Sequence, residues 1–159
     1  MKITLVVVGQ IKEKYYRDAV AEYAKRLSAY CTLNIIEVAD EKTRENMSEA
    51  ELRTLLSEEG ERILAKLPSQ AYVAALCIDG KQRDSVAMSR WMDSLTVRGT
   101  SHIAFLIGGS VGLSDEVICR ADEKISFSDL TFPHQLMRVI LLEQIYRWFK
   151  ISKGEPYHK

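Results

Sequence analysis

Short apolar runs rich in β-branched residues alternate along the chain with segments of helical periodicity, and this alternation restricts the fold more than any other feature. The runs predict strands at residues 3–8, 32–38, 71–78, 102–107 and 124–127, the third of them ending at Asp79-Gly80. Apolar side chains spaced by three and four residues predict helices at about 12–29, 85–97, 114–121 and 134–152. Ser48 and Glu51 fit a capping box for a further helix that ends before Pro68. Strands that alternate with helices indicate an α/β fold, with a mostly parallel sheet covered by helices on both faces.

The 159 residues show no internal repeat, low-complexity segment or linker, so we expect one domain over residues 1–159. A hydrophobic content of 47% excludes general disorder, and no apolar run approaches the roughly 20 residues of a membrane span. We interpret the apolar start of the chain as a buried first strand and expect a cytoplasmic protein without a membrane partner. The three cysteines and three histidines lack the spacing of a disulfide framework or a metal site, so we expect no metal.

The 22 basic and 22 acidic side chains balance, which argues against a protein that binds nucleic acid over its whole surface. Bases nevertheless gather near the C-terminus, at Arg138, Arg147, Lys150, Lys153 and Lys159. This cluster has two interpretations: a local surface for RNA phosphates beside aromatic side chains, or an ordinary solvated face.

The predicted helix 134–152 carries more apolar residues than one helix face can hold. Such a helix is either buried in the centre of the monomer or covered by a second copy of the chain. In so small a domain we predict a homodimer.

The segment Gly108-Gly109-Ser110-Val111-Gly112 follows a predicted strand and precedes a predicted helix. Formally it matches the G-x-S-x-G nucleophile elbow, and a serine hydrolase would use Ser110 with an acid and a histidine drawn from Asp115, Asp122, Asp129, His134 and His158. Alternatively, the turn binds a ligand through its backbone, because glycines allow close approach. It matches neither the Rossmann fingerprint nor the P-loop. Ligands of open parallel sheets gather beyond the carboxyl ends of the strands, which points to the loops after residues 78, 107 and 127.

Three segments together carry a more specific pattern. They are residues 105–113, residues 125–139 with Thr131-Phe132-Pro133-His134-Gln135, and residues 143–147 with the tail Pro156-Tyr157-His158-Lys159. The chain thereby resembles the ribosomal RNA large subunit methyltransferase H family, which consists of small SPOUT methyltransferases. The resemblance covers essentially the whole length.

The resemblance implies transfer of a methyl group from S-adenosyl-L-methionine to N3 of a pseudouridine in 23S ribosomal RNA, within the assembled ribosome. It also implies a SPOUT-type fold whose C-terminal part forms a trefoil knot. A binder that associates with the ribosome without catalysis is the alternative.

Carried over by motif, the implied cofactor-binding residues lie in three loops: Leu76, Gly108, Phe127, Ser128, Asp129, Leu130, Thr131 and Phe132. The implied catalytic residues are Arg147, for phosphate or a base carbonyl, Tyr157, for stacking on a flipped base, and His158, for proton transfer. The structural alternatives are a helix-surface salt bridge from Arg147 to Glu143 and a frayed tail. His134 is expected only to shape the start of the last helix.

Overall fold

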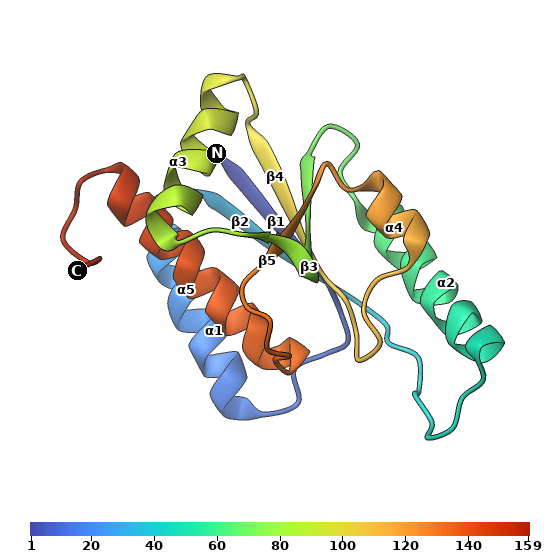
Figure 1. Cartoon of the computed structure of the whole chain (residues 1–159). Helices are drawn as coiled ribbons and strands as arrows, with labels where there is room; N and C mark the ends of the chain where they lie inside the picture. Colours follow the sequence, from blue (N-terminus) through green and yellow to red (C-terminus); the bar gives the residue numbers. More distant parts are fainter.

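A parallel five-stranded sheet forms the centre of the computed structural model, which describes residues 1–159 (Figure 1). The strand order is β2-β1-β4-β3-β5, and every neighbouring pair is parallel. The strands are β1 (Lys2–Val8), β2 (Thr32–Val38), β3 (Tyr72–Gln82), β4 (His102–Ile107) and β5 (Glu123–Ser126). The predicted α/β class with a parallel sheet is confirmed.

Helices cover both faces of the sheet, as predicted. They are α1 (Lys14–Leu27), α2 (Glu49–Lys66), α3 (Ser85–Val97), α4 (Asp115–Arg120) and α5 (His134–Ser152). Figure 1 shows α1, α3 and α5 on one side of the sheet and α2 with α4 on the other. The capping box of α2 is confirmed, because the Ser48 backbone donates to Glu51 Oε2 at 2.8 Å and Ser48 Oγ accepts from the Glu51 backbone at 3.2 Å. No helix is long and apolar enough to cross a membrane.

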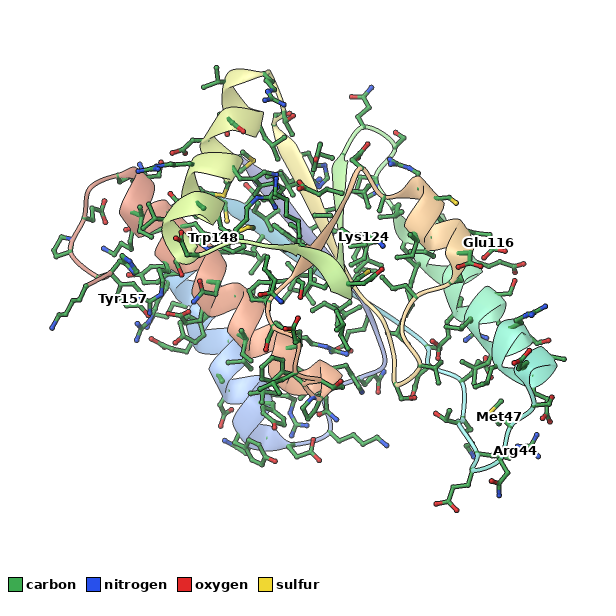
Figure 2. All side chains as sticks on the ribbon, viewed as in Figure 1. Arg44, Met47, Glu116, Lys124, Trp148 and Tyr157 are labelled. Atoms are coloured by element: carbon green, nitrogen blue, oxygen red, sulfur yellow. The ribbon has the colours of Figure 1, made fainter.

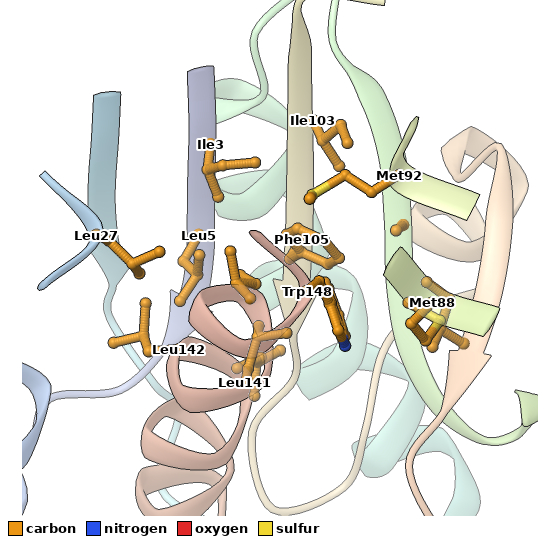
Figure 3. Close-up of a cluster of buried hydrophobic side chains, with 14 of the residues drawn as sticks. Ile3, Leu5, Leu27, Met88, Met92, Ile103, Phe105, Leu141, Leu142 and Trp148 are labelled. Atoms are coloured by element: carbon orange, nitrogen blue, oxygen red, sulfur yellow. The ribbon is translucent and has the colours of Figure 1, made fainter. Parts of the chain in front are cut away.

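Strand β1 explains why both faces need a cover. Its side chains alternate across the sheet, so Ile3, Leu5 and Val7 join the larger hydrophobic core while Val6 and Val8 join the smaller one. All five residues are completely buried. Figure 3 shows the larger core, where Ile3 and Leu5 face the same space as Phe105 of β4 and Trp148 of α5. A continuously apolar strand is therefore satisfied only in the middle of a covered parallel sheet.

Helix α5 is packed between α1 and α3 within one chain. Its side chains Leu141, Leu142, Ile145 and Trp148 are completely buried in the larger core. The apolar excess of this helix is thus explained by the monomer, as one of the two interpretations predicted. The excess itself carries no argument for a dimer.

Strand β3 is longer than predicted, since it continues through Asp79-Gly80 to Gln82. The prediction was wrong because the chain bulges out of the sheet and then pairs with β5 a second time. Ile125 of β5 faces both Leu76 and Lys81 in the register of the two strands. A Cβ at Gly80 would lie 2.7 Å from the Ile125 backbone nitrogen, so only glycine permits this close approach.

The side chain of Arg138 ties α5 to the loop after β1. It is 1% exposed, and its Nη2 donates to the carbonyl oxygens of Val8 at 3.0 Å and Gly9 at 2.6 Å. Its Nη1 donates to Glu37 Oε1 of β2 at 2.8 Å. One guanidinium therefore satisfies groups from two strands at the end of the sheet where the strands lead into their loops.

We predict that Arg138→Met lowers the free energy of unfolding by about 2–4 kcal/mol, because the buried carbonyls and Glu37 lose their donor. Urea titration followed by circular dichroism measures the change. Arg53→Met serves as the control, since Arg53 forms only an exposed pair with Glu49 at 3.8 Å. Equal stability of both variants would contradict a structural role for Arg138.

Candidate active site

A cavity of about 970 Å³ lies at the carboxyl ends of β3, β4 and β5. We call it the loop cavity, because its walls are the loops after these three strands together with the start of α5. Most of its lining residues lie in the ranges 76–79, 107–113, 124–128 and 130–137. Seven of the eight predicted cofactor-binding residues line it: Leu76, Gly108, Phe127, Ser128, Leu130, Thr131 and Phe132. The position agrees with the sheet rule used on the sequence.

The eighth residue, Asp129, does not line the loop cavity. Its Oδ1 accepts from Gln82 Nε2 at 2.7 Å, which holds the side chain toward the end of β3. The neighbouring loop is fixed by its own polar groups: Ser128 Oγ accepts from the Leu130 backbone at 3.0 Å, and Ser126 Oγ donates to the Ser128 carbonyl at 3.1 Å. Asp129 therefore contributes to the shape of this loop, not to the cavity surface.

The glycine turn after β4 is tight because two glycines have no room for a side chain. A Cβ at Gly108 would lie 2.6 Å from the Gly112 carbonyl carbon, and one at Gly109 would meet Glu59 Oε2 and Val8 at 3.1 Å. Gly112 has φ +89°, a conformation that favours glycine. The turn consequently presents backbone to the loop cavity.

The serine hydrolase alternative is not supported by the surroundings of Ser110. Its Oγ lies 2.8 Å from Thr43 Oγ1 and hydrogen-bonds to no histidine. A nucleophile of this class needs a base within hydrogen-bond reach. The glycine turn is thus better described as a binding turn.

Three side chains with a formal charge line the loop cavity, Asp79, Asp115 and Lys124, and His134 lies beside them. Lys124 Nζ bonds to Asp79 Oδ2 at 2.5 Å, which lowers the pKa of Asp79 and raises the pKa of Lys124. Burial, followed by the charge of Arg138, lowers the pKa of His134, so this ring is neutral at pH 7. With one ion pair and one further carboxylate, the wall carries a slight negative charge. Nowhere do three or more His, Cys, Asp or Glu side chains gather as a metal site would require.

Two of the three predicted catalytic residues, Arg147 and Tyr157, meet at Glu143 of α5, and His158 lies beside Arg147. Glu143 Oε1 accepts from Arg147 Nε at 3.1 Å and from the Tyr157 hydroxyl at 3.0 Å. The Arg147 guanidinium lies over the Tyr157 ring, 4.7 Å from its centroid, and its Nη1 lies 3.4 Å from His158 Nδ1. We call Glu143, Arg147, Tyr157 and His158 the tail cluster. The two structural alternatives have different outcomes. The Glu143–Arg147 salt bridge is present, whereas the tail is packed on α5 through Tyr157 and is not frayed.

The tail cluster and the loop cavity are separate within one chain. None of Arg147, Tyr157 and His158 lines the loop cavity. Figure 2 shows Tyr157 on the tail beside α5, far from Lys124 of β5. Because a guanidinium can only donate, His158 Nδ1 is the acceptor in this contact. The Nδ1 atom is thereby engaged as long as His158 faces Arg147.

The comparisons with known proteins agree on one family. A family model described as "Predicted SPOUT methyltransferase" matches residues 1–158. The chain is 57% identical to the ribosomal RNA large subunit methyltransferase H of Bifidobacterium adolescentis and 55% identical to that of Clostridioides difficile, each over 159 residues and all of both chains. This chain belongs to the ribosomal RNA large subunit methyltransferase H family. The resemblance stated from the sequence is confirmed.

Solved structures of more distant methylases share the fold. A probable methylase family protein from Haemophilus influenzae aligns with a TM-score of 0.55 at 11% identity, covering 99% of this chain and 70% of the other. A putative methylase family protein from Neisseria gonorrhoeae aligns with a TM-score of 0.51 at 11% identity, covering 99% and 86%. At this identity the likeness concerns the fold alone.

The predicted basic surface near the C-terminus is largely neutralised in this family member. Arg138 is buried, Arg147 is paired with Glu143, and Lys150 Nζ is paired with Glu155 Oε2 at 2.6 Å. Only Lys153 and Lys159 among the five bases form no ion pair. These bases therefore do not form an open basic face, because counting charges along the sequence ignores the acids that fold against them. Contact of the cluster with RNA phosphates stays a prediction.

Sequence reasoning missed two residues of the site. His134 lines the loop cavity, although it was expected only to shape the helix start. Glu143 organises the tail cluster, whereas the sequence offered it only as the partner of a surface salt bridge. The four-residue spacing of Glu143 and Arg147 was the signal that the sequence offered for this contact. It does not indicate that Tyr157 also bonds to the Glu143 carboxylate.

We predict that Glu143→Gln lowers the pKa of Tyr157 from about 12 toward its ordinary value of 10.0, since burial and the Glu143 carboxylate together raise it. Titration of tyrosine ¹³Cζ resonances by nuclear magnetic resonance measures this change. Glu155→Gln is the matched control, because Glu155 raises the pKa of Tyr30 instead. A Tyr157 pKa that stays near 12 in Glu143→Gln would contradict the cluster.

Proposed function

We propose that the protein transfers a methyl group from S-adenosyl-L-methionine to N3 of a pseudouridine in 23S ribosomal RNA, within the assembled ribosome in the cytoplasm. The observation that carries the proposal is the loop cavity, which holds seven residues of the family's cofactor pattern in a chain with named relatives at 55–57% identity. Those relatives are named for methylation of large-subunit ribosomal RNA. The remaining details rest on the family resemblance.

The residues of the loop cavity fit such a methyl donor. The volume of about 970 Å³ lies within the range of about 300–1,000 Å³ typical of small-molecule sites. Exposed apolar side chains at the rim, Ile78 and Leu130, suit a purine ring, and the backbone at Gly108 can approach the ligand closely. The slight negative charge of the wall suits a sulfonium cation. When bound, the cofactor supplies the electrophilic methyl carbon for an in-line displacement.

The protein's own contribution is to position both reactants and to remove a proton. The N3 proton of the target base must leave as the N–C bond forms. We assign the proton transfer to His158, released from Arg147 when RNA binds. Arg147 then contacts a phosphate or a base carbonyl, and Tyr157 stacks on the displaced base.

We propose that the active form is a homodimer of 1–159 domains. The support is the separation of the tail cluster from the loop cavity within one chain. A second copy that brings its tail over this cavity would complete the site.

We further propose that the C-terminal part forms the trefoil knot of the SPOUT family. The register of β5 on β3 supports this, because the residues between Leu76 and Lys81 leave the sheet as a loop beside Ile125. The α5 segment that follows would then leave through that loop.

The test is transfer of a tritiated methyl group from S-adenosyl-L-methionine to ribosomes that lack the modification. We expect label on large-subunit RNA in assembled ribosomes, and none on separated subunits or free RNA. Cofactor binding without label anywhere would leave the non-catalytic ribosome binder as the function.

Two variants separate cofactor binding from turnover. We expect Gly108→Leu to abolish cofactor binding in calorimetry, because its side chain would collide with the Gly112 backbone. Ser110→Ala changes the same turn without crowding the backbone and should bind within about threefold of the wild type, less than about 1 kcal/mol. Deletion of residues 157–159 should keep cofactor affinity and remove methyl transfer. Full activity of the truncated protein would refute the role of the tail.

A further inference from the structure

The glycine turn of the loop cavity rests on helix α2. The pair Glu59-Gly60 lies where α2 meets the turn and the start of α4, and Figure 1 shows the two helices next to each other. A Cβ at Gly60 would lie 3.2 Å from Ser114 Cβ and 3.3 Å from Val117 Cγ2, so a side chain there would push α4 away. This packing brings Glu59 to the turn, where its Oε2 lies 3.1 Å from the position of a Cβ on Gly109.

The carboxylate of Glu59 is buried without an ion pair. The residue is 3% exposed, its Oε1 accepts from the Glu41 backbone at 2.9 Å, and its Oε2 has no hydrogen-bond partner. Arg62 of the same helix bonds instead to the Glu41 side chain and to the Ala39 carbonyl at 3.0 Å. Buried carboxylates are normally paired with a cation or with several donors, so this one lacks its usual partner.

The groups around Glu59 do not compensate its charge. Burial raises the pKa of Glu59 most, the charges of Asp40 and Glu41 raise it further, and the Glu41 backbone and the Arg62 charge lower it. The glycine turn, residues 108–112, contains no titratable side chain. From that direction, a positive charge therefore reaches Glu59 only when a ligand brings it.

The loop cavity is the place for such a ligand. Gly109 belongs to its wall and Glu59 does not, so the backbone of the turn separates the carboxylate from the cavity. The one cation of the lining, Lys124, is already bonded to Asp79 at 2.5 Å. Charges interact far more strongly through protein than through water. A cationic ligand in the cavity thus stabilises the buried carboxylate, whereas a neutral ligand of the same shape does not.

We propose that Glu59 is a specificity-determining residue that strengthens binding of the sulfonium form of the cofactor over the thioether that remains after methyl transfer. Glu59 has a cation to stabilise before the transfer and none after it, because the S–C bonding electrons stay on sulfur when the methyl group bonds to N3. The residue acts through the turn and touches neither reactant. This inference rests on the proposed function and adds a charge-based preference for the methyl donor over the product.

Calorimetry with S-adenosyl-L-methionine and S-adenosyl-L-homocysteine at neutral pH tests the preference. The two ligands differ only in the methyl group and its positive charge. We expect Glu59→Gln to weaken binding of S-adenosyl-L-methionine about tenfold and to leave that of S-adenosyl-L-homocysteine within about twofold. Glu58→Gln is the matched control, because it removes the same charge from the neighbouring, exposed position of α2 and should change neither affinity. An equal loss for both ligands in Glu59→Gln would overturn the proposal.

Thermal unfolding without any ligand separates this role from a structural one. Because burial raises the pKa of Glu59 in the folded protein, its charge destabilises the fold at neutral pH and ceases to do so as the pH falls toward the ordinary value of 4.5. Gln keeps an acceptor for the Glu41 backbone but carries no charge. We expect Glu59→Gln to melt higher than the wild type at neutral pH, with a difference that shrinks in acid. A lower melting temperature, or failure to fold, would make the carboxylate a structural requirement and contradict the proposal.

The wild-type charge can also be followed without changing Glu59. Protonation of Glu59 removes the advantage of the cation, so the affinity ratio of S-adenosyl-L-methionine to S-adenosyl-L-homocysteine should fall as the solution is acidified. The same fall is expected in His134→Asn, which removes the histidine of the cavity. A ratio independent of pH in this variant would reject the role of Glu59. Wild-type protein that binds neither ligand would instead refute the proposed cofactor, so the two failures are distinguishable.

Discussion

The double pairing of β5 with β3 is the constraint on which the functional part of the molecule depends. Because Ile125 faces both Leu76 and Lys81, the residues between them must leave the sheet, and Cys77, Ile78 and Asp79 of that bulge become a wall of the loop cavity. The same pairing fixes the start of the 127–133 loop, whose side chains line cavities on both of its sides. Gly80 makes this possible by allowing the two backbones to touch. A local irregularity of one strand thus creates the site.

Most of the framework could be predicted because it depends on neighbouring residues and on simple periodicity. The alternation in β1, the capping box at Ser48 and the apolar spacing of α5 each act within a few residues. The extension of β3 past Asp79-Gly80 could not be predicted in this way. Its cause is a strand more than 40 residues further along the chain, and a Gly that ordinarily marks a turn serves there as a point of close contact.

The candidate site likewise has one part that could be predicted from the sequence and one part that could not. Backbone loops at strand ends followed from the sheet rule, and the family pattern named residues that the fold then brought together around one cavity. The tail cluster needed the structure, because Tyr157 returns to Glu143 over 14 positions and changes a simple helix salt bridge into a three-residue contact. The unpaired oxygen of Glu59 is even less visible in sequence, since an absence of partners is a property of the packed molecule.

The pairing of the C-terminal bases has a consequence for how this protein would distinguish its RNA. Arg147 and Lys150 already face carboxylates, so a phosphate that contacts one of them replaces an existing ion pair. The net gain in binding energy is only the difference between the phosphate contact and the carboxylate contact. Attraction through these two bases is therefore weak, and the formal net charge of zero adds no general attraction to it. Free RNA offers chiefly that attraction. A folded ribosomal surface also offers displaced bases of fixed geometry, and the energy for opening the Glu143 contacts must come from stacking and from hydrogen bonds to the bases. The neutralisation of the residues that the sequence presents as a basic patch would thus favour a shaped substrate over free RNA, in agreement with the proposed function.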